Sequence, residues 1–269
     1  MVSSRPLSLF RIVNAVELDI RRIVVRALVV AGVAFVAAAS GCGGGDDTGN
    51  GGDGSAGGEA TTTIQAPDTV QADENTAEVV DRLFPVTPGR EWVYEGEEGG
   101  AKTRVEQRVL DRTETIAGIE AAVIDVKEYE DGKLIEHTFD YYAQTPDGDV
   151  LYMGEDIDDI EGGKVVGHKG EWRAGKDDAK PGLFMPAKPK VGQAFEQERA
   201  PGIAEDRSTV VKLGVKVTVP AGTFTDCMKT EDFAPLDNAT EFKYYCPGVG
   251  LVREEAEGGA HADLVRYSK

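Results

Sequence analysis

"IEAAVIDVKEYEDGKLIEHTFDYYAQ", residues 119–144, carries the clearest fold signal of this 269-residue chain. Two runs, 119–129 and 133–144, are rich in β-branched and aromatic residues and flank Asp131-Gly132. An Asp-Gly pair between two such runs is typical of the two-residue turn of a β-hairpin. The stretch therefore predicts two neighbouring antiparallel strands.

Similar runs continue toward both ends of the chain, with further turns indicated at 146–148 (PDG) and 220–222 (PAG). The other runs are EWVYEG (91–96), TRVEQRVLDRTET (103–115), DVLYMGE (149–155), STVVKLGVKVTV (208–219), TFTDCMKTED (223–232), EFKYY (241–245), GLVREEA (250–256) and HADLVRYSK (261–269). Short turns favour antiparallel pairing, and the many charged residues indicate one buried and one solvated face. We expect about ten strands in a mainly β domain, built as a strongly curved antiparallel sheet or open barrel. A two-sheet sandwich is the alternative.

One short helix is expected where the domain begins. Asn75 and Glu78 have the spacing of a capping box in front of the apolar residues Val79 and Leu83, and Pro85 would end the helix.

The first 41 residues resemble a secretory signal peptide. A basic start that includes Arg21, Arg22 and Arg26 precedes an uncharged, largely apolar run at 27–41. As a helix this run would cover about 22 Å, less than the roughly 30 Å of a hydrocarbon core. Residues 1–41 are therefore expected to direct export, by general secretion or by the twin-arginine route that Arg21-Arg22 faintly resembles.

Ala39-Ser40-Gly41-Cys42 resembles the bacterial lipobox, with Ala39 in place of the usual leucine. The resemblance implies that Cys42 receives diacylglycerol on its sulfur, becomes the first mature residue and is further acylated, for example with palmitate. Two or more acyl chains anchor a protein stably. We therefore expect an exported protein held on the outer face of a bacterial membrane.

Composition divides the rest of the chain into two parts. Residues 42–74 are rich in Gly, Asp and Thr and are expected to form a flexible tether, because they offer little apolar surface to bury. Residues 75–269 are expected to form a single globular domain. The chain from residue 42 on has 24 basic and 46 acidic residues. This excess argues against binding to nucleic acid or to anionic lipid, both of which need Lys and Arg.

Six stretches resemble a family of uncharacterised bacterial exported proteins and lipoproteins. They are FPVTPGREWVYE (84–95), YYAQTPDGDVLYMGE (141–155), GEWRAG (170–175), AKPGLFMPAKP (179–189), VPAGTFTDC (219–227) and KYYCPGVGLV (243–252). The resemblance implies an exported β-rich domain and no particular activity. Cys227 and Cys246 depart from it, since a small or apolar residue would be expected at both positions.

These two cysteines are predicted to form a disulfide. If the run at 223–232 folds back on 241–247 around a loop at 235–238, directly opposed residues have numbers that sum to 473, as 227 and 246 do. Opposed strand residues lie about 4.5 to 5.5 Å apart, close to the range that a disulfide accepts. Two unpaired thiols in a slipped register are the alternative.

The familiar catalytic motifs are absent: the sequence has no G-x-S-x-G, H-E-x-x-H, P-loop or C-x-x-C. His137, His168 and His261 share no ligand spacing. The acidic run 155–161 lacks the alternating ligands and glycine of an EF-hand, which favours a solvated charged strand over a calcium site. We predict no catalytic residues, no metal and no cofactor.

If the domain has a ligand site, the irregular-looking segment 152–192 and the aromatic strand before it are expected to form it. The candidate side chains are Tyr141, Tyr142, Tyr152, Glu155 and Trp172, with a small apolar or glycan molecule as ligand. Packing of these aromatics in the core is the alternative, and the segment would then only plug one end of the sheet.

Two functional classes follow: a non-enzymatic binding or structural module of the cell envelope, and an envelope glycan hydrolase. The hydrolase would pair Glu155 with Glu196 or Asp206 across a glycosidic bond. Two carboxylates that converge beside an aromatic wall would favour it.

Overall fold

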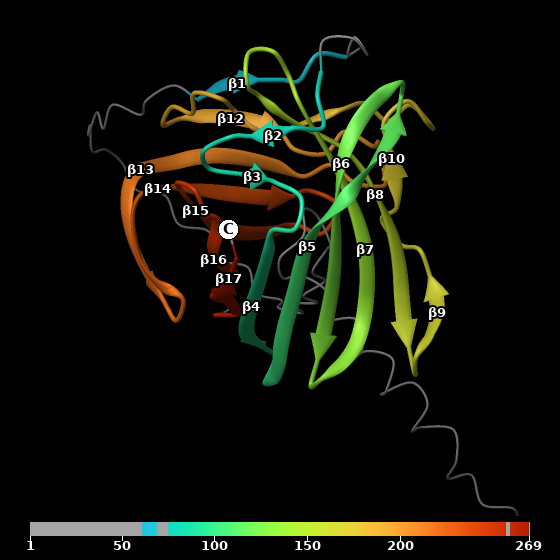
Figure 1. Cartoon of the computed structure of the whole chain (residues 1–269), viewed down its shortest axis with the longest axis vertical. Coiled ribbons are helices and arrows are strands. Elements are labelled where there is room, and N and C mark those ends of the chain that lie inside the picture. The colour runs from blue at the N-terminus through green and yellow to red at the C-terminus, as the bar shows by residue number, and fades with distance from the viewer. Residues whose placement is uncertain (1–60, 69–74, 257–258, 269) are drawn as a thin grey trace, which may run out of the picture.

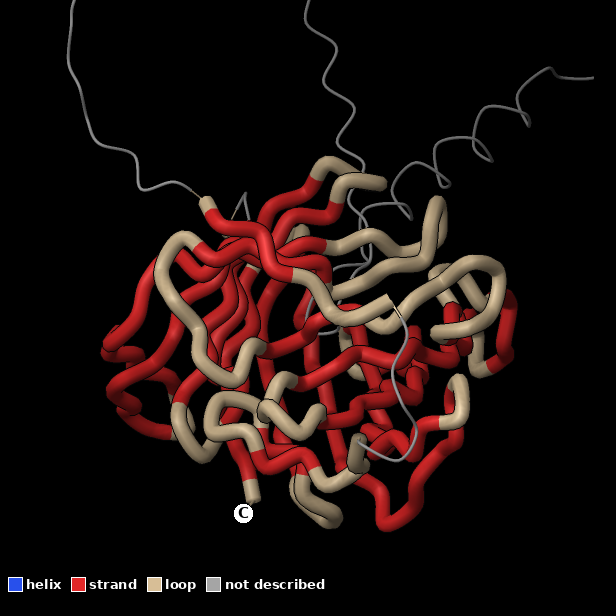
Figure 2. The backbone as a smooth tube through the Cα atoms, turned by 90° about the horizontal axis from the view of Figure 1, so that it is seen from above, coloured by secondary structure: helices blue, strands red, loops and turns tan. Residues whose placement is uncertain are grey.

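The computed structural model describes residues 61–68, 75–256 and 259–268. These residues form strands and no helix (Figures 1 and 2). The strands are β1 (Thr62–Ile64), β2 (Val79–Val80), β3 (Pro85–Val86), β4 (Glu91–Glu98), β5 (Ala101–Ile116), β6 (Ile119–Glu130), β7 (Lys133–Gln144), β8 (Val150–Glu161), β9 (Lys164–Gly167), β10 (Trp172–Arg173), β11 (Gly182–Met185), β12 (Gln193–Glu196), β13 (Arg207–Val219), β14 (Gly222–Ala234), β15 (Ala239–Cys246), β16 (Gly250–Ala256) and β17 (His261–Tyr267).

Fifteen of the strands form one continuous sheet, and β2 and β3 form a small hairpin beside it. The order is β1-β12-β13-β14-β15-β16-β17-β4-β5-β6-β7-β8-β10, with β9 and β11 also paired to β8. Every pair is antiparallel except β1 with β12, so the sheet is mixed. The mainly β prediction is confirmed, and the sheet does not close. In Figure 1, β12–β14 run across the view, whereas β5–β8 run along its long axis.

The three turns predicted from the sequence are present. Asp131 and Gly132 both have positive φ, 46° and 76°, and Glu130 lies opposite Lys133. Positive φ at both central positions is the geometry of a type I′ turn, whose twist matches that of paired strands. The other two turns join β7 to β8 and β13 to β14.

The prediction of a helix after Asn75 is wrong. Val79 and Val80 form β2 and pair with Val86 and Pro85 of β3. The Gln144 side chain accepts a hydrogen bond from the Val80 N–H at 3.0 Å, which ties this hairpin to the end of β7. Contacts with the sheet therefore outweigh the local capping signal.

Part of the segment expected to be a tether belongs to the sheet. Residues 62–64 pair with β12, and Ala66 is buried. The β-branched residues of this short stretch suit an edge strand. The expected boundary at residue 75 is therefore too late, while Cys42 and the signal peptide lie outside the described residues.

The predicted disulfide is present. Cys227 and Cys246 are bonded, with their Cα atoms 4.2 Å apart. The ladder beside them runs without a break from Met228 opposite Tyr245 to Ala234 opposite Ala239. The predicted register is confirmed.

Segment 152–192 is more regular than expected. Its first part is the long strand β8, and β9, β10 and β11 fold back to pair with that strand. Among the described residues, no helix has the length and apolar character needed to cross a membrane.

Candidate functional site

Acidic side chains face one another across β6, β7 and β8. Glu136 of β7 lies directly opposite both Glu128 of β6 and Asp159 of β8. Four residues along β7, on the same face, Asp140 lies opposite Glu155. Like charges in directly opposed positions destabilise a sheet, so these pairs are unusual in a buried face.

Two β-bulges create these pairs. Ile135 is an extra residue in β7 opposite β6, and Met153 is an extra residue in β8 opposite β7. Without them Glu128 would face Ile135, and Asp140 would face Gly154. Bulges re-aim side chains and are common next to functional sites.

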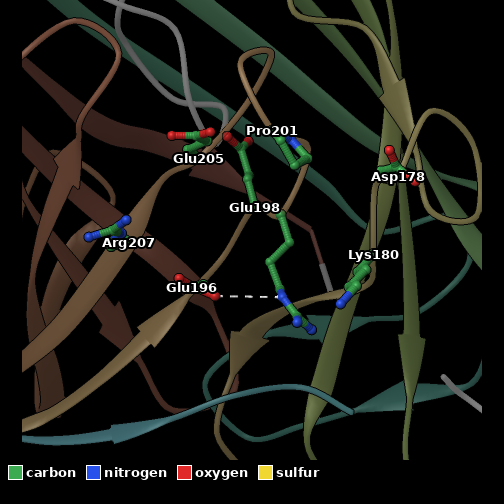
Figure 3. A pocket seen from close by; sticks show the side chains of 8 residues that line it. Asp178, Lys180, Glu196, Glu198, Pro201, Glu205 and Arg207 are labelled. Atoms are coloured by element: carbon green, nitrogen blue, oxygen red, sulfur yellow. Dashed lines mark ion pairs between the residues drawn. The ribbon is translucent and has the colours of Figure 1, made fainter. Parts of the chain in front are cut away.

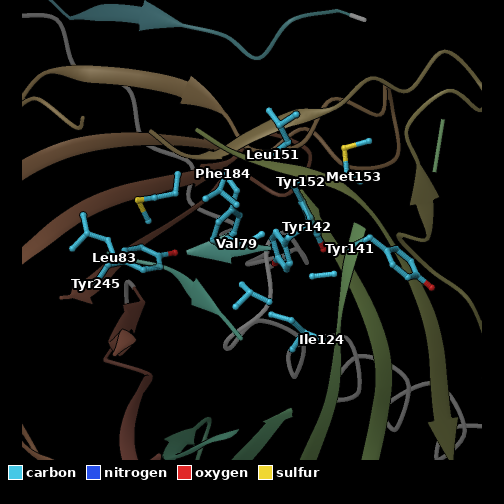
Figure 4. Close-up of a cluster of buried hydrophobic side chains, with 14 of the residues drawn as sticks. Val79, Leu83, Ile124, Tyr141, Tyr142, Leu151, Tyr152, Met153, Phe184 and Tyr245 are labelled. Carbon is cyan, nitrogen blue, oxygen red and sulfur yellow. The ribbon is translucent and has the colours of Figure 1, made fainter. Parts of the chain in front are cut away.

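An aromatic wall lies beside the second acidic pair. Figure 4 shows Tyr142, Tyr152 and Phe184 of this wall. Tyr142 stacks on Tyr152 with ring centroids 4.9 Å apart, and Trp172 meets Tyr152 edge-on at 5.3 Å. The Tyr152 hydroxyl donates a hydrogen bond to Asp140 at 2.8 Å. Phe184 closes the cluster against both tyrosines. The site therefore combines aromatic surface with carboxylates.

Two glycines allow the surrounding segments to approach β8. A Cβ at Gly154 would lie 2.3 Å from the Trp172 carbonyl oxygen, and one at Gly182 would lie 1.8 Å from the Gln197 carbonyl oxygen. Gly182 is also directly opposite Tyr152. The missing side chains therefore place the backbone that carries Glu198 next to the aromatic wall.

Glu198 links this interior to a cavity of about 270 Å³ (Figure 3). Its side chain is 1% exposed, and neither carboxylate oxygen has a hydrogen-bond partner among the described residues. Charged side chains also line the cavity, including Lys180, Glu196 and Arg207. Glu198 therefore helps to form the cavity wall, while its carboxylate oxygens stay closed to solvent.

Burial raises the pKa of the acidic groups at this site. The pKa of Asp140 rises to about 7 through burial and the charge of Glu136, although the Tyr152 hydrogen bond opposes the shift. The pKa of Glu155 lies well above its usual value because of burial, then Glu198 and Asp140. Burial and the charge of Asp206 likewise raise the pKa of Glu198, and the nearby Lys243 ammonium opposes this shift. The carboxylates therefore repel one another when ionised.

A second buried acidic group, on β14–β16, has its own cation. The Lys243 ammonium lies 3.3 Å from Asp232, 3.6 Å from Glu241 and 3.9 Å from Glu254. Burial alone would lower the pKa of Lys243, and these carboxylates raise it instead. In contrast, no Lys or Arg of the described residues forms an ion pair with Glu155 or Glu198.

Four of the five predicted site residues converge. Tyr142, Tyr152, Glu155 and Trp172 meet in the cluster described above, and all four are buried. Tyr141 points to the other side of the sheet, where its hydroxyl donates to Asp156 at 2.7 Å and Arg173 lies over its ring. Their role in ligand binding stays a prediction.

The pairs proposed for a hydrolase have different surroundings. Glu196 lies on the cavity wall and pairs with Arg199 at 3.6 Å. Asp206 lies near Glu198, and burial raises its pKa to about 7. The carboxylates that act most strongly on Glu155 are Glu198 and Asp140, which the sequence analysis missed.

The histidines do not assemble into a site. His137 pairs with Asp125 at 2.7 Å, His168 lies near Asp158 at 3.2 Å, and His261 is exposed on β17. Within the described part of the chain, no three His, Cys, Asp or Glu side chains are arranged to hold a metal ion.

No protein-family model and no curated protein matches the chain. Among solved structures, a "putative exported protein with YmcC-like fold" from Bacteroides fragilis is 16% identical, with a TM-score of 0.38 over 70% of this chain and 100% of that chain. A "putative lipoprotein" from Parabacteroides distasonis is 15% identical, with a TM-score of 0.39 over 70% and 99%. At these scores the likeness supports no conclusion about this chain.

Proposed function

We propose that this protein is an exported, lipid-anchored module of the cell envelope that binds a small ligand in the cavity that Glu198 helps to line. The observation that carries the proposal is the buried, unpartnered carboxylate of Glu198 beside an open cavity. Burying an ionisable group without a partner is costly, and a purely structural core gains nothing from it. Such groups are enriched at functional sites.

The anchor part of the proposal rests on the sequence. Ala39-Ser40-Gly41-Cys42 follows an apolar run and precedes a Gly-rich segment, as in lipoprotein signals. Growth with a labelled fatty acid should mark the wild-type protein and leave Cys42→Ala unmarked. Equal labelling of both would contradict the anchor and leave the binding site unaffected.

Native mass spectrometry tests the binding part. The Cys42→Ala protein retains every described residue and lacks the expected lipid, so any added mass comes from another molecule. We expect an adduct that is lost in Glu198→Gln and kept in Glu231→Gln, a matched change at an exposed position of β14. A site-intact protein without any adduct would contradict ligand binding.

A further inference from the structure

We infer that the ligand of the cavity is a small organic acid, and that its carboxylate binds to Lys180 and Arg199 in the place that the Asp68 side chain takes in this structure. This inference rests on the proposed function, because it names the chemistry of the ligand for the same cavity.

Lys180 and Arg199, which both line the cavity, form a clamp for one carboxylate. The Lys180 ammonium lies 3.0 Å from one carboxylate oxygen of Asp68, and the Arg199 guanidinium donates a hydrogen bond to the other. The hydrogen bonds from Arg199 and Lys180 lower the pKa of Asp68, so the clamp favours an ionised carboxylate. The cavity wall therefore carries a carboxylate site whose occupant is a side chain of the protein itself.

The clamp has supports other than Asp68. The Lys180 N–H donates to the Arg199 carbonyl at 3.0 Å, which holds the two residues side by side. The Arg199 side chain is 11% exposed, and its guanidinium also donates to the Pro181 carbonyl at 3.2 Å and lies 3.6 Å from Glu196. Cations that the fold positions in advance lose little freedom when they bind a ligand.

Asp68, in contrast, is weakly held. Its side chain is 62% exposed, and it follows β1, which three residue pairs join to β12. Exposed ion pairs contribute little to stability, so the exchange of Asp68 for another carboxylate costs the fold little. A fixed clamp with a replaceable occupant is what exchange with a ligand requires.

The rest of the cavity wall favours an organic acid over a phosphate. Arg207 is exposed on this wall and forms no ion pair with a described residue, so it offers the ligand a second attachment. Glu196 and Glu205, which accept hydrogen bonds from the Gln65 amide and the Gly202 N–H, would repel the concentrated charge of a phosphate. The volume of about 270 Å³ corresponds to roughly nine water volumes, which is room for a molecule the size of succinate.

Isothermal titration of the Cys42→Ala protein with succinate tests the inference. Saturable binding is expected, and succinamide, which has a similar shape without the charges, should give none. Lys180→Gln should weaken binding at least about tenfold, the effect of losing a hydrogen bond between charged groups. Lys188→Gln removes the same charge from an exposed position outside the cavity and should leave binding unchanged.

Asp68→Asn separates a ligand site from a structural ion pair. The variant frees the clamp from its own carboxylate, so succinate should bind about fivefold more tightly, the equivalent of one exposed ion pair. Asp111→Asn, a matched change at an exposed position of β5, should not alter binding. Melting curves guard against misfolding, because all of these changes are at partly or fully exposed side chains and should shift Tm by no more than a few degrees.

Equal binding of succinamide, equal weakening by Lys188→Gln, or weaker binding to Asp68→Asn would refute the inference. Binding of inorganic phosphate without binding of succinate would refute it as well. A native adduct without succinate binding would also refute it and leave the proposed function standing. Absence of both would refute both.

Discussion

The ladders β14–β15 and β7–β8 both place carboxylates directly opposite each other, yet they treat them differently. Asp232 faces Glu241 in a ladder without a break, and the Lys243 ammonium lies 3.3 Å from Asp232 and 3.6 Å from Glu241. Asp140 faces Glu155 across a bulged ladder, and neither forms an ion pair with a described Lys or Arg. The comparison teaches that the fold can supply a cation for buried acids. Asp140 and Glu155 have no such cation among the described residues, and burial raises the pKa of both.

Among the changes that test this comparison, removal of Lys243 should lower the stability of the protein most. Lys243→Met leaves the carboxylates of Asp232, Glu241 and Glu254 without their cation, which typically costs roughly 3 to 5 kcal/mol of unfolding free energy. Urea titration would measure the loss. Lys229→Met is the matched control, because Lys229 lies over the rings of Phe242 and Tyr244 and forms no described ion pair. Equal losses in the two variants would show that the buried charges are not the cause.

The disulfide stabilises the regular β14–β15 ladder and not the bulged β7–β8 ladder. Double replacement of Cys227 and Cys246 by Ala should lower the unfolding free energy by roughly 2 to 4 kcal/mol. Any ligand adduct should be retained, because the cavity is lined by residues of other segments. Thiol titration of the unfolded, unreduced protein checks the premise, and two reactive thiols at these positions would refute it.

The pH dependence of the unfolding free energy should reveal the charge of Asp140 and of the buried carboxylates near it. In the folded state the pKa of Asp140 is about 7, because of burial and Glu136, whereas an unfolded Asp titrates near 4. The folded protein therefore holds protons that the unfolded chain releases. This contribution to stability should be fully present below about pH 4 and be lost as pH rises to about 7, by about 1.4 kcal/mol per pH unit for each such proton.

Urea midpoints from pH 5 to 8 would test this sign, and Asp140→Asn should flatten the profile. Asp140 faces Glu155, Glu136 and the Tyr152 hydroxyl, so the variant also changes their repulsion and one hydrogen bond. Stability that rises with pH over this range would contradict the assignment.

The smallest loss of stability is expected when the strand β1, at the amino-terminal edge of the sheet, is removed. A chain that begins at residue 75 loses the β1 ladder and the ion pairs of Asp68 with Lys180 and Arg199. A few exposed hydrogen bonds and ion pairs amount to roughly 1 to 2 kcal/mol, or several degrees in Tm. A chain that begins at residue 61 should melt like the longer protein. Identical melting of both shortened chains would show that β1 adds nothing.

The sequence predicts the regular ladder and not the bulged ones. Positions 223–232 and 241–247 pair symmetrically about their loop, so simple addition places Cys227 beside Cys246. In β7 and β8 the extra residues are Ile135 and Met153, whose apolar side chains resemble their neighbours. Nothing local marks Ile135 as a bulge, whereas Gly154, directly after Met153, is a glycine inside a strand and the one signal from which the opposition of Asp140 to Glu155 could have been predicted.

The candidate site was likewise predicted only where sequence neighbours form it. Tyr142, Tyr152, Glu155 and Trp172 come from adjoining strands, and their convergence follows from the hairpins. Glu198 comes from a distant segment that reaches them because Gly182 has no side chain. A close approach of two backbones has no signature beyond a single glycine.

Tension on the chain would enter this fold at a weak edge. β1 is the first described strand, and three residue pairs hold it to β12. Asp68, four residues further on, holds Lys180 and Arg199 at the rim of the cavity. A pull from the side of residue 61 would strain β1 first and then draw Asp68 away from both cations. Mechanical force from a surface to which the chain is attached would thereby change the charge around the cavity mouth.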